Sequence, residues 1–507
     1  MLSVRTTRPA PASPKDEADE AVASFSVTSW SWYGFMMALA VVVAAALSGL
    51  HRGISGDALW HLADGRWILA HQRIPRTNPF GWSTGSTPWI NLEWGWDIAS
   101  AGLVAALGTP GLGLWLLAMV GVIAWSQHRR WNALGIRPLA QGDWIFLTLV
   151  LTSAAWAWRP QLVSYALFPL WCGTLEFGSR NPRRWWWLVP ELLVWQTFHG
   201  GYLIGLMAWI IWIGEALWPR LHPHALDVPQ PLPWRTILGV TGAMALTLGL
   251  TPWGWGGFGH AVWESLNPVI SRSITEWQSP NFHVLWWAAT IGGPVVAIGG
   301  WIYAHPESRL GVSRAQWLIW ALCLGGTMLA IRQVPFYFEQ TAIIGAGIGL
   351  WHPQQRTPPL RGRWMVLVLA VLGFAITPEI QAWFTPHVGI PPAMVRVLRR
   401  HPGRIVNGYR AGDGLVSLGI ADSLDGRTDL FVATPHDWFL QSESAESGAW
   451  PWPRLSRWLQ AYDVRYVLWP TSRGGSQEMA GRAGVTQVDQ QHGLTLFRIA
   501  LAQPRKG

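Results

Sequence analysis

Long apolar segments recur along most of this 507-residue chain, and they constrain its fold more than any other feature. Most approach the roughly 17–25 residues that a helix needs to cross the hydrocarbon core of a bilayer. Charged residues make up 13% of the chain, against about 25% in soluble domains. Its 40 tryptophans suit the aromatic belts at membrane surfaces. These features exclude a disordered chain and predict an all-α polytopic membrane protein.

We expect about eleven transmembrane helices in a membrane domain of residues 29–378. The expected spans are residues 31–50, 111–127, 142–158, 161–177, 185–198, 202–218, 236–251, 284–303, 315–331, 336–351 and 364–378. The segment 185–198 is the shortest, and its loss would move the C-terminus to the other side of the membrane. Residues 1–28 are polar and carry no cleavable signal pattern, which predicts a disordered cytoplasmic tail.

The distribution of basic residues sets the expected orientation. With the N-terminus in the cytoplasm, most arginines of the membrane part fall on the cytoplasmic side, as the positive-inside rule requires. The net charge of +9 is spread over single and paired arginines without a long basic run, which argues against nucleic acid as a partner. Both cysteines lie in apolar segments, so we expect neither a disulfide framework nor a CxxC metal site.

Residues 379–507 differ in composition and predict a small extracytoplasmic α/β domain. Short β-prone runs at 404–409, 465–469 and 494–499 predict strands, and residues 454–461 predict a helix before the second strand. The length of the segment is sufficient for an independent hydrophobic core. Neither a dinucleotide-binding glycine pattern nor a P-loop is present in it.

The first external loop, residues 51–98, holds the densest set of polar groups. Helical spacing over residues 55–70 places Asp57, His61 and Asp64 on one helix face. A carboxylate and an imidazole on one face can act as a general base pair or as part of a metal shell.

Each of these residues also has a structural interpretation. Asp57 follows Gly56 and could cap the helix, and His61 could be a packed interfacial histidine. Asp64 precedes Gly65, which favours a solvated residue at a helix end. Further along the loop, Glu93 opens an amphipathic helix that ends near Gly108.

Other polar groups lie at external junctions between apolar segments, where ionisable residues usually face a cavity or a partner. They are Arg159, Gln161, His199, Glu276 and Arg332. Arg159 and Arg332 could extend to the outer headgroups or bind the phosphate of a lipid carrier with forked guanidinium contacts. Because most of these groups lie on one side of the bilayer, they indicate a site at its outer surface.

Several motifs resemble a family of bacterial multispan proteins that is grouped with the GT-C glycosyltransferase superfamily. They are residues 56–68, 74–80, 159–161, 198–201, 275–280 and 425–431. The resemblance runs from about residue 50 to the end of the chain. It implies a transferase that uses a polyprenyl-phosphate sugar, with an aspartate in the first external loop at the position of Asp57. Many GT-C enzymes have paired acids there, whereas Ala58 follows Asp57.

We therefore expect a glycosyltransferase in the bacterial inner (plasma) membrane, with Asp57 as general base and His61 and Glu93 orienting the substrates. Arg159 and Arg332 would bind phosphate, and Gln161, His199 and Glu276 would line or support the cavity. The expected partners are a lipid carrier and a cell-envelope acceptor (glycan, lipid or protein). The sequence assigns no certain cofactor and leaves a divalent cation possible, and the expected donor substrate is the polyprenyl-phosphate sugar. The alternative is a non-catalytic protein, either a lipid-linked sugar translocator or an envelope scaffold, including an inactive relative of the enzymes.

Overall fold

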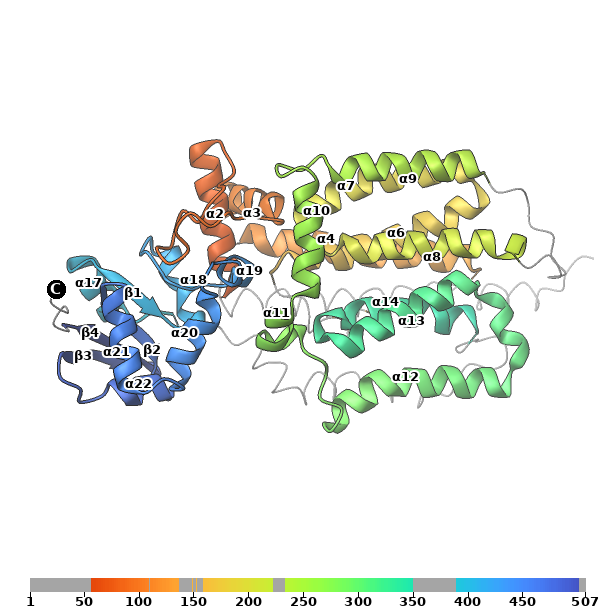
Figure 1. Cartoon of the computed structure of the whole chain (residues 1–507). Helices are drawn as coiled ribbons and strands as arrows, with labels where there is room; N and C mark the ends of the chain where they lie inside the picture. Colours follow the sequence, from red (N-terminus) through yellow and green to blue (C-terminus); the bar gives the residue numbers. More distant parts are fainter. Residues whose placement is uncertain are drawn as a thin grey trace, which may run out of the picture.

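The computed structural model describes residues 56–108, 110–135, 158–221, 233–349 and 389–500, together with Thr148 and Thr152. Long helices form a bundle, and a small α/β domain of the C-terminal residues lies at one end of it (Figure 1). Helices α2 (Asp57–His71) and α3 (Trp94–Leu107) lie at the same end. The expected combination of a mostly helical fold with a small C-terminal sheet is confirmed.

The described bundle helices overlap eight of the expected spans. They are α4 (Pro110–Ala133), α6 (Gln161–Arg180), α7 (Leu188–Phe198), α8 (Tyr202–Leu221), α9 (Trp234–Leu248), α12 (Leu285–Ala304), α13 (Arg314–Leu329) and α14 (Val334–Gly347). Within the described residues, two helical segments, Gly111–Ala133 and Leu285–Ala304, are long and apolar enough to cross a membrane.

The total of eleven spans stays a prediction. Helices α7 and α14 have 11 and 14 residues, and at about 1.5 Å per residue they are shorter than a hydrocarbon core of about 30 Å. The expected spans 31–50 and 364–378 lie outside the described residues, as does nearly all of 142–158.

Aromatic packing and one buried ion pair hold the bundle together. The fully buried rings of Trp171 and Trp195 meet edge to face, with centroids 5.9 Å apart. Arg130 on α4 contacts the Glu176 carboxylate of α6 at 2.6 Å and donates a hydrogen bond to Gln340 of α14. A buried guanidinium needs such partners, so these contacts fix the three helices relative to one another.

Helix α2 (Asp57–His71) forms within the expected first external loop, residues 51–98, and α3 (Trp94–Leu107) begins at its end. The cap of α2 is Gly56, and the Asp57 side chain makes no capping hydrogen bond. The interpretation of Asp57 as a helix cap is therefore wrong. Helix α3 follows Glu93 and ends at Gly108, as expected.

Short elements complete the connections between the long helices. They are α10 (Trp255–Leu266), α11 (Pro268–Ser273) and the 3-10 turns η2 (Pro182–Trp187), η3 (Thr275–Trp277), η4 (Pro306–Gly311) and η5 (Ile331–Gln333). Of these, α10 and α11 lie beside the C-terminal domain (Figure 1).

The C-terminal domain contains a four-stranded sheet in the order β1-β2-β4-β3. Its strands are β1 (Arg404–Asn407), β2 (Val464–Pro470), β3 (Val485–Gln491) and β4 (Leu494–Ile499). Its helices are α17 (Pro392–Arg400), α18 (Tyr409–Ser417), α19 (Thr428–Val432), α20 (Trp438–Ser447), α21 (Trp452–Ala461) and α22 (Gly474–Met479). Strand β1 is parallel to β2, and the other pairs are antiparallel.

The sequence predicted three of these strands and helix α21, but it missed β3. Strand β3 is at the edge of the sheet, most of its side chains are exposed, and it contains few apolar residues. An edge strand without a buried face lacks the alternation of apolar and polar residues that reveals a strand in a sequence.

Candidate functional site

A guanidinium group joins two carboxylates where the bundle meets the C-terminal domain. Arg159, which precedes α6, contacts Asp57 on α2 at 3.3 Å and Glu276 in η3 at 2.6 Å. The three side chains are 25%, 22% and 30% exposed, so the cluster stays open to solvent. Residues from three distant parts of the sequence thus form one charged group.

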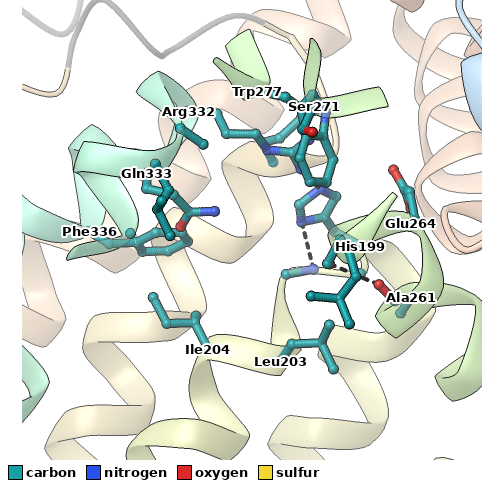
Figure 2. Close-up of a pocket in the computed structure, with 18 of the residues that line it drawn as sticks. His199, Leu203, Ile204, Ala261, Glu264, Ser271, Trp277, Arg332, Gln333 and Phe336 are labelled. Atoms are coloured by element: carbon teal, nitrogen blue, oxygen red, sulfur yellow. Dashed lines mark hydrogen bonds between the residues drawn. The ribbon is translucent and has the colours of Figure 1, made fainter. Parts of the chain in front are cut away.

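A cavity of about 780 Å³ lies next to this cluster. Four of the residues predicted from the sequence line it, namely Glu93, Gln161, His199 and Arg332. Trp277, which follows Glu276 in the chain, lies on its wall (Figure 2). Asp57 and Arg159 are not among the lining residues, so they adjoin the cavity and do not form its wall.

One wall of the cavity carries a guanidinium group over an aromatic ring. The Arg332 guanidinium carbon lies 4.0 Å from the centre of the Trp277 ring, and a guanidinium nitrogen lies 3.3 Å from His199 Nε2 (Figure 2). No ion pair of Arg332 is found in the described part of the chain. Burial and the charge of Arg332 lower the pKa of His199 well below its ordinary value, so its imidazole is neutral.

The cavity also contains two carboxyl groups, Glu93 and Glu264. Burial and the neighbouring Asp429 raise the pKa of Glu264 to about 7, and burial and Glu264 raise that of Glu93 well above its ordinary range. The sequence analysis missed Glu264. The signal available was His260 one turn earlier on α10, since residues at i and i+4 share a helix face.

His61 lies behind the site and does not face the cavity. Its side chain is buried, its Nδ1 lies 2.5 Å from Asp97 Oδ1, and its ring stacks on Trp60. Burial lowers the pKa of His61 to about 3 and raises that of Asp97 to about 8. This places His61 in a supporting position one helical turn from Asp57.

The interpretation of Asp64 as a solvated helix end is wrong. Helix α2 continues to His71, and Asp64 is fully buried, with Asn91 donating a hydrogen bond to it at 2.8 Å. Asp64 is buried because α3 packs closely against this part of α2: a Cβ on Gly65 would lie 2.0 Å from the backbone oxygen of Asp97. Burial and Asp97 raise the pKa of Asp64 well above its ordinary value.

The C-terminal domain contributes directly to the site. A Cβ on Gly426 would lie 2.7 Å from Asp57 Oδ1, so only glycine allows this approach. Asp429 pairs with His260 of α10 at 3.1 Å, and Tyr409 shares a hydrogen bond with Thr428 at 3.0 Å. The sequence analysis singled out residues 425–431 as a motif but did not assign them to the site.

Arg427 holds residues 425–431 against α2 and the loop between α2 and α3. Its buried guanidinium pairs with Asp425 and lies 6.0, 5.1 and 4.8 Å from the ring centres of Trp60, Phe80 and Trp89. Cation–π contacts of a desolvated guanidinium are among the stronger ones. The position of Gly426 beside Asp57 therefore depends on a buried charge.

The charged cluster does not fit a divalent cation. No group of three or more His, Cys, Asp or Glu side chains that could hold a metal ion is found among the described residues. Asp57 and Glu276 already share the Arg159 guanidinium, which fills the space between them.

Comparisons with known proteins place the fold. No family model matches the chain. The crystal structure of an oligosaccharyltransferase from Archaeoglobus fulgidus in the apo form has a TM-score of 0.50 and 11% identity, over 87% of this chain and 70% of that one. The same values hold for that enzyme tethered to an acceptor peptide containing the NVT sequon. The fold of this chain is similar to that of this oligosaccharyltransferase. At this identity the likeness concerns the fold alone.

Two further proteins show similarity to this chain. The archaeal oligosaccharyltransferase AglB from Archaeoglobus fulgidus, in complex with an inhibitory peptide and a dolichol-phosphate, has a TM-score of 0.49 and 12% identity, with the same coverage. NADH-ubiquinone oxidoreductase chain 6 of Gadus morhua is 27% identical over 108 residues, which are 20% of this chain. That match spans 61% of the relative's length, less than two thirds.

Proposed function

We propose that this chain is an integral-membrane glycosyltransferase that transfers a sugar from a polyprenyl-phosphate carrier to an extracytoplasmic acceptor. The observation that carries the proposal is the cavity in a GT-C-like fold, with a guanidinium on one wall, carboxyl groups on another and the Asp57 cluster beside it. The chain would lie in the bacterial plasma membrane, with the C-terminal domain outside.

In the proposed reaction, an acceptor hydroxyl or amide attacks the anomeric carbon of the sugar. The bond from that carbon to the phosphate oxygen breaks, and Asp57 takes the proton of the acceptor. The polyprenyl phosphate leaves with the bonding electron pair. Because charge develops on this phosphate, a fixed cation beside it lowers the barrier.

Arg332 is the better phosphate ligand of the two arginines. It faces the cavity without a carboxylate partner among the described residues, and stacking on Trp277 holds its plane in place. Arg159 is already engaged by Asp57 and Glu276, so a phosphate would have to displace a carboxylate. We therefore revise the role expected for Arg159: it orients Asp57, and Glu276 orients Arg159.

The remaining residues hold the site in shape. Glu93 and Gln161 would bind sugar or acceptor hydroxyls from the cavity wall, and His199 would position Arg332. His61 would support Asp57 through its bond to Asp97.

The decisive experiment is an incubation of the purified protein with a panel of radiolabelled polyprenyl-phosphate sugars and membrane-extracted acceptors. Transfer of label to an acceptor supports the enzyme. A translocator would instead move labelled lipid across a proteoliposome membrane without forming a new glycosidic bond, and a scaffold would do neither. Either of these results rejects the proposed function.

We expect transfer to continue after removal of divalent cations. Because Arg159 already supplies a positive charge between Asp57 and Glu276, a chelator should lower the rate by less than about twofold. The measurement is the transfer rate in EDTA, with and without added Mg²⁺ or Mn²⁺. A loss of activity that added metal restores would show that a cation binds elsewhere in the site.

We also expect binding of the donor lipid to weaken as pH rises through about 7, where Glu264 loses its proton. The protonated carboxyl is neutral, whereas the carboxylate repels the phosphate at Arg332; the phosphodiester of the donor keeps its charge throughout this range. Affinity measured from pH 5.5 to 8.5 should fall in the wild type and stay flat in Glu264→Gln. Parallel curves would exclude Glu264 as the titrating group.

A further inference from the structure

A second cavity, of about 660 Å³, opens between α4, α6 and α7. Phe177, near the end of α6, lines it, whereas Gln161 at the start of that helix lines the first cavity. Sixteen residues of α-helix span about 24 Å, so this cavity lies near the opposite end of the bundle. Nothing in the proposed reaction uses it.

Three arginines gather at this end. Arg129 and Arg184 line the cavity, and together with Arg180 they also line a shallower basin that continues from it. The Arg129 guanidinium carbon lies 4.9 Å from the ring centres of both Trp125 and Phe177. The Arg184 guanidinium carbon lies 5.8 Å from the centre of the same Phe177 ring. Stacking thus gathers positive charge around one ring.

The neighbouring Arg130 has a structural role, in contrast to these three arginines. It is buried and paired with Glu176 at 2.6 Å. By contrast Arg129, Arg180 and Arg184 are exposed, and none of them has an ion pair among the described residues. Their charges are therefore available to an anion.

The inner part of the cavity is mostly apolar but contains one carboxyl group. Leu167, Leu170 and Val194 are among its lining residues, which suit an acyl chain. Glu191 also lines it, is nine-tenths buried, and its Oε1 has no hydrogen-bond partner among the described groups. An unpaired polar group at membrane depth indicates a ligand that supplies the missing contact.

We propose that this cavity binds one anionic phospholipid. Its phosphate lies among Arg129, Arg180 and Arg184, one acyl chain lies along the apolar wall, and the polar glycerol region lies beside Glu191. Forked guanidinium groups suit phosphate geometry, and an acyl chain accounts for the apolar depth that a free phosphate ion would not use. The site is separate from the donor cavity and does not rest on the proposed function.

The test compares the wild type with the double variant Arg129→Gln/Arg184→Gln in neutral detergent. Arg183→Gln is the matched control, because Arg183 is exposed on the same turn η2 but lines neither cavity. Native mass spectrometry and thermal unfolding are recorded with added phosphatidylglycerol, phosphatidylcholine or inorganic phosphate. Unfolding without added lipid shows whether each variant is folded.

We expect phosphatidylglycerol to bind and stabilise the wild type and Arg183→Gln. It should bind the double variant about a hundredfold or more weakly, because two charged hydrogen bonds are lost and each contributes about tenfold or more. Phosphatidylcholine and inorganic phosphate should have little effect. Equal binding of the two lipids, equal binding to all three proteins, or stabilisation by inorganic phosphate alone would overturn the proposal.

Discussion

Replacing Asp57 with Asn is expected to lower the rate of sugar transfer by a factor of roughly 10² to 10⁴, the usual contribution of a general base. Asparagine keeps the shape and can still accept a hydrogen bond from Arg159, which contacts Asp57 at 3.3 Å. It cannot take the proton of the acceptor. The measurement is the initial rate with a saturating labelled donor, together with binding of that donor.

The control for this variant is Asp463→Asn, an exposed aspartate ahead of β2. It makes the same chemical change in the C-terminal domain and should leave the rate unchanged. Donor affinity should be nearly the same in both variants, because Arg332 and not Asp57 is the proposed phosphate ligand. A wild-type rate for Asp57→Asn in correctly inserted protein would reject the assignment of the base.

Replacing Arg427 with Ala is expected to destabilise the protein by about 3–5 kcal/mol, because it leaves the fully buried Asp425 without its partner. The loss also removes the guanidinium from among Trp60, Phe80 and Trp89. We expect residues 389–500 to separate from α2 and α3 before the bundle unfolds. Limited proteolysis and thermal unfolding in detergent measure this.

The matched control is Arg482→Ala, which removes an exposed ion pair to Glu478 within the same domain. Such a pair contributes less than about 1 kcal/mol, so this variant should unfold like the wild type. If Arg427→Ala also unfolds like the wild type, Arg427 does not hold the domain against the loop. Transfer activity should fall together with stability, since Gly426 beside Asp57 belongs to the same segment.

Much of the local structure could be predicted from the sequence. The helical spacing of Asp57 and His61 predicted α2, and the polar start at Glu93 predicted α3 with its end at Gly108. Apolar segments predicted where the described bundle helices lie, and β-branched runs predicted three of four strands. These features depend on residues within one or two helical turns or along one strand, so a linear pattern records them.

The roles within the site could not be predicted in the same way. Helical spacing puts Asp57, His61 and Asp64 on one face, but it cannot say that α3 covers the latter two and leaves Asp57 at the cavity edge. Nor can it reveal the raised pKa of Glu264, which depends on burial and on Asp429 in another domain.

The sequence by itself determined the helical bundle, the separate C-terminal domain and the set of polar residues at one end of the bundle. Only the tertiary structure decided that Arg159 joins Asp57 to Glu276, 117 residues away from that arginine, and that Arg332 faces a cavity instead. The physical reason is that periodicity arises from neighbours in the chain, whereas ion pairing and burial depend on how distant helices pack. A buried or paired charged group has a different chemistry from an exposed one. The packing of the helices alone determines which of these groups are buried or paired.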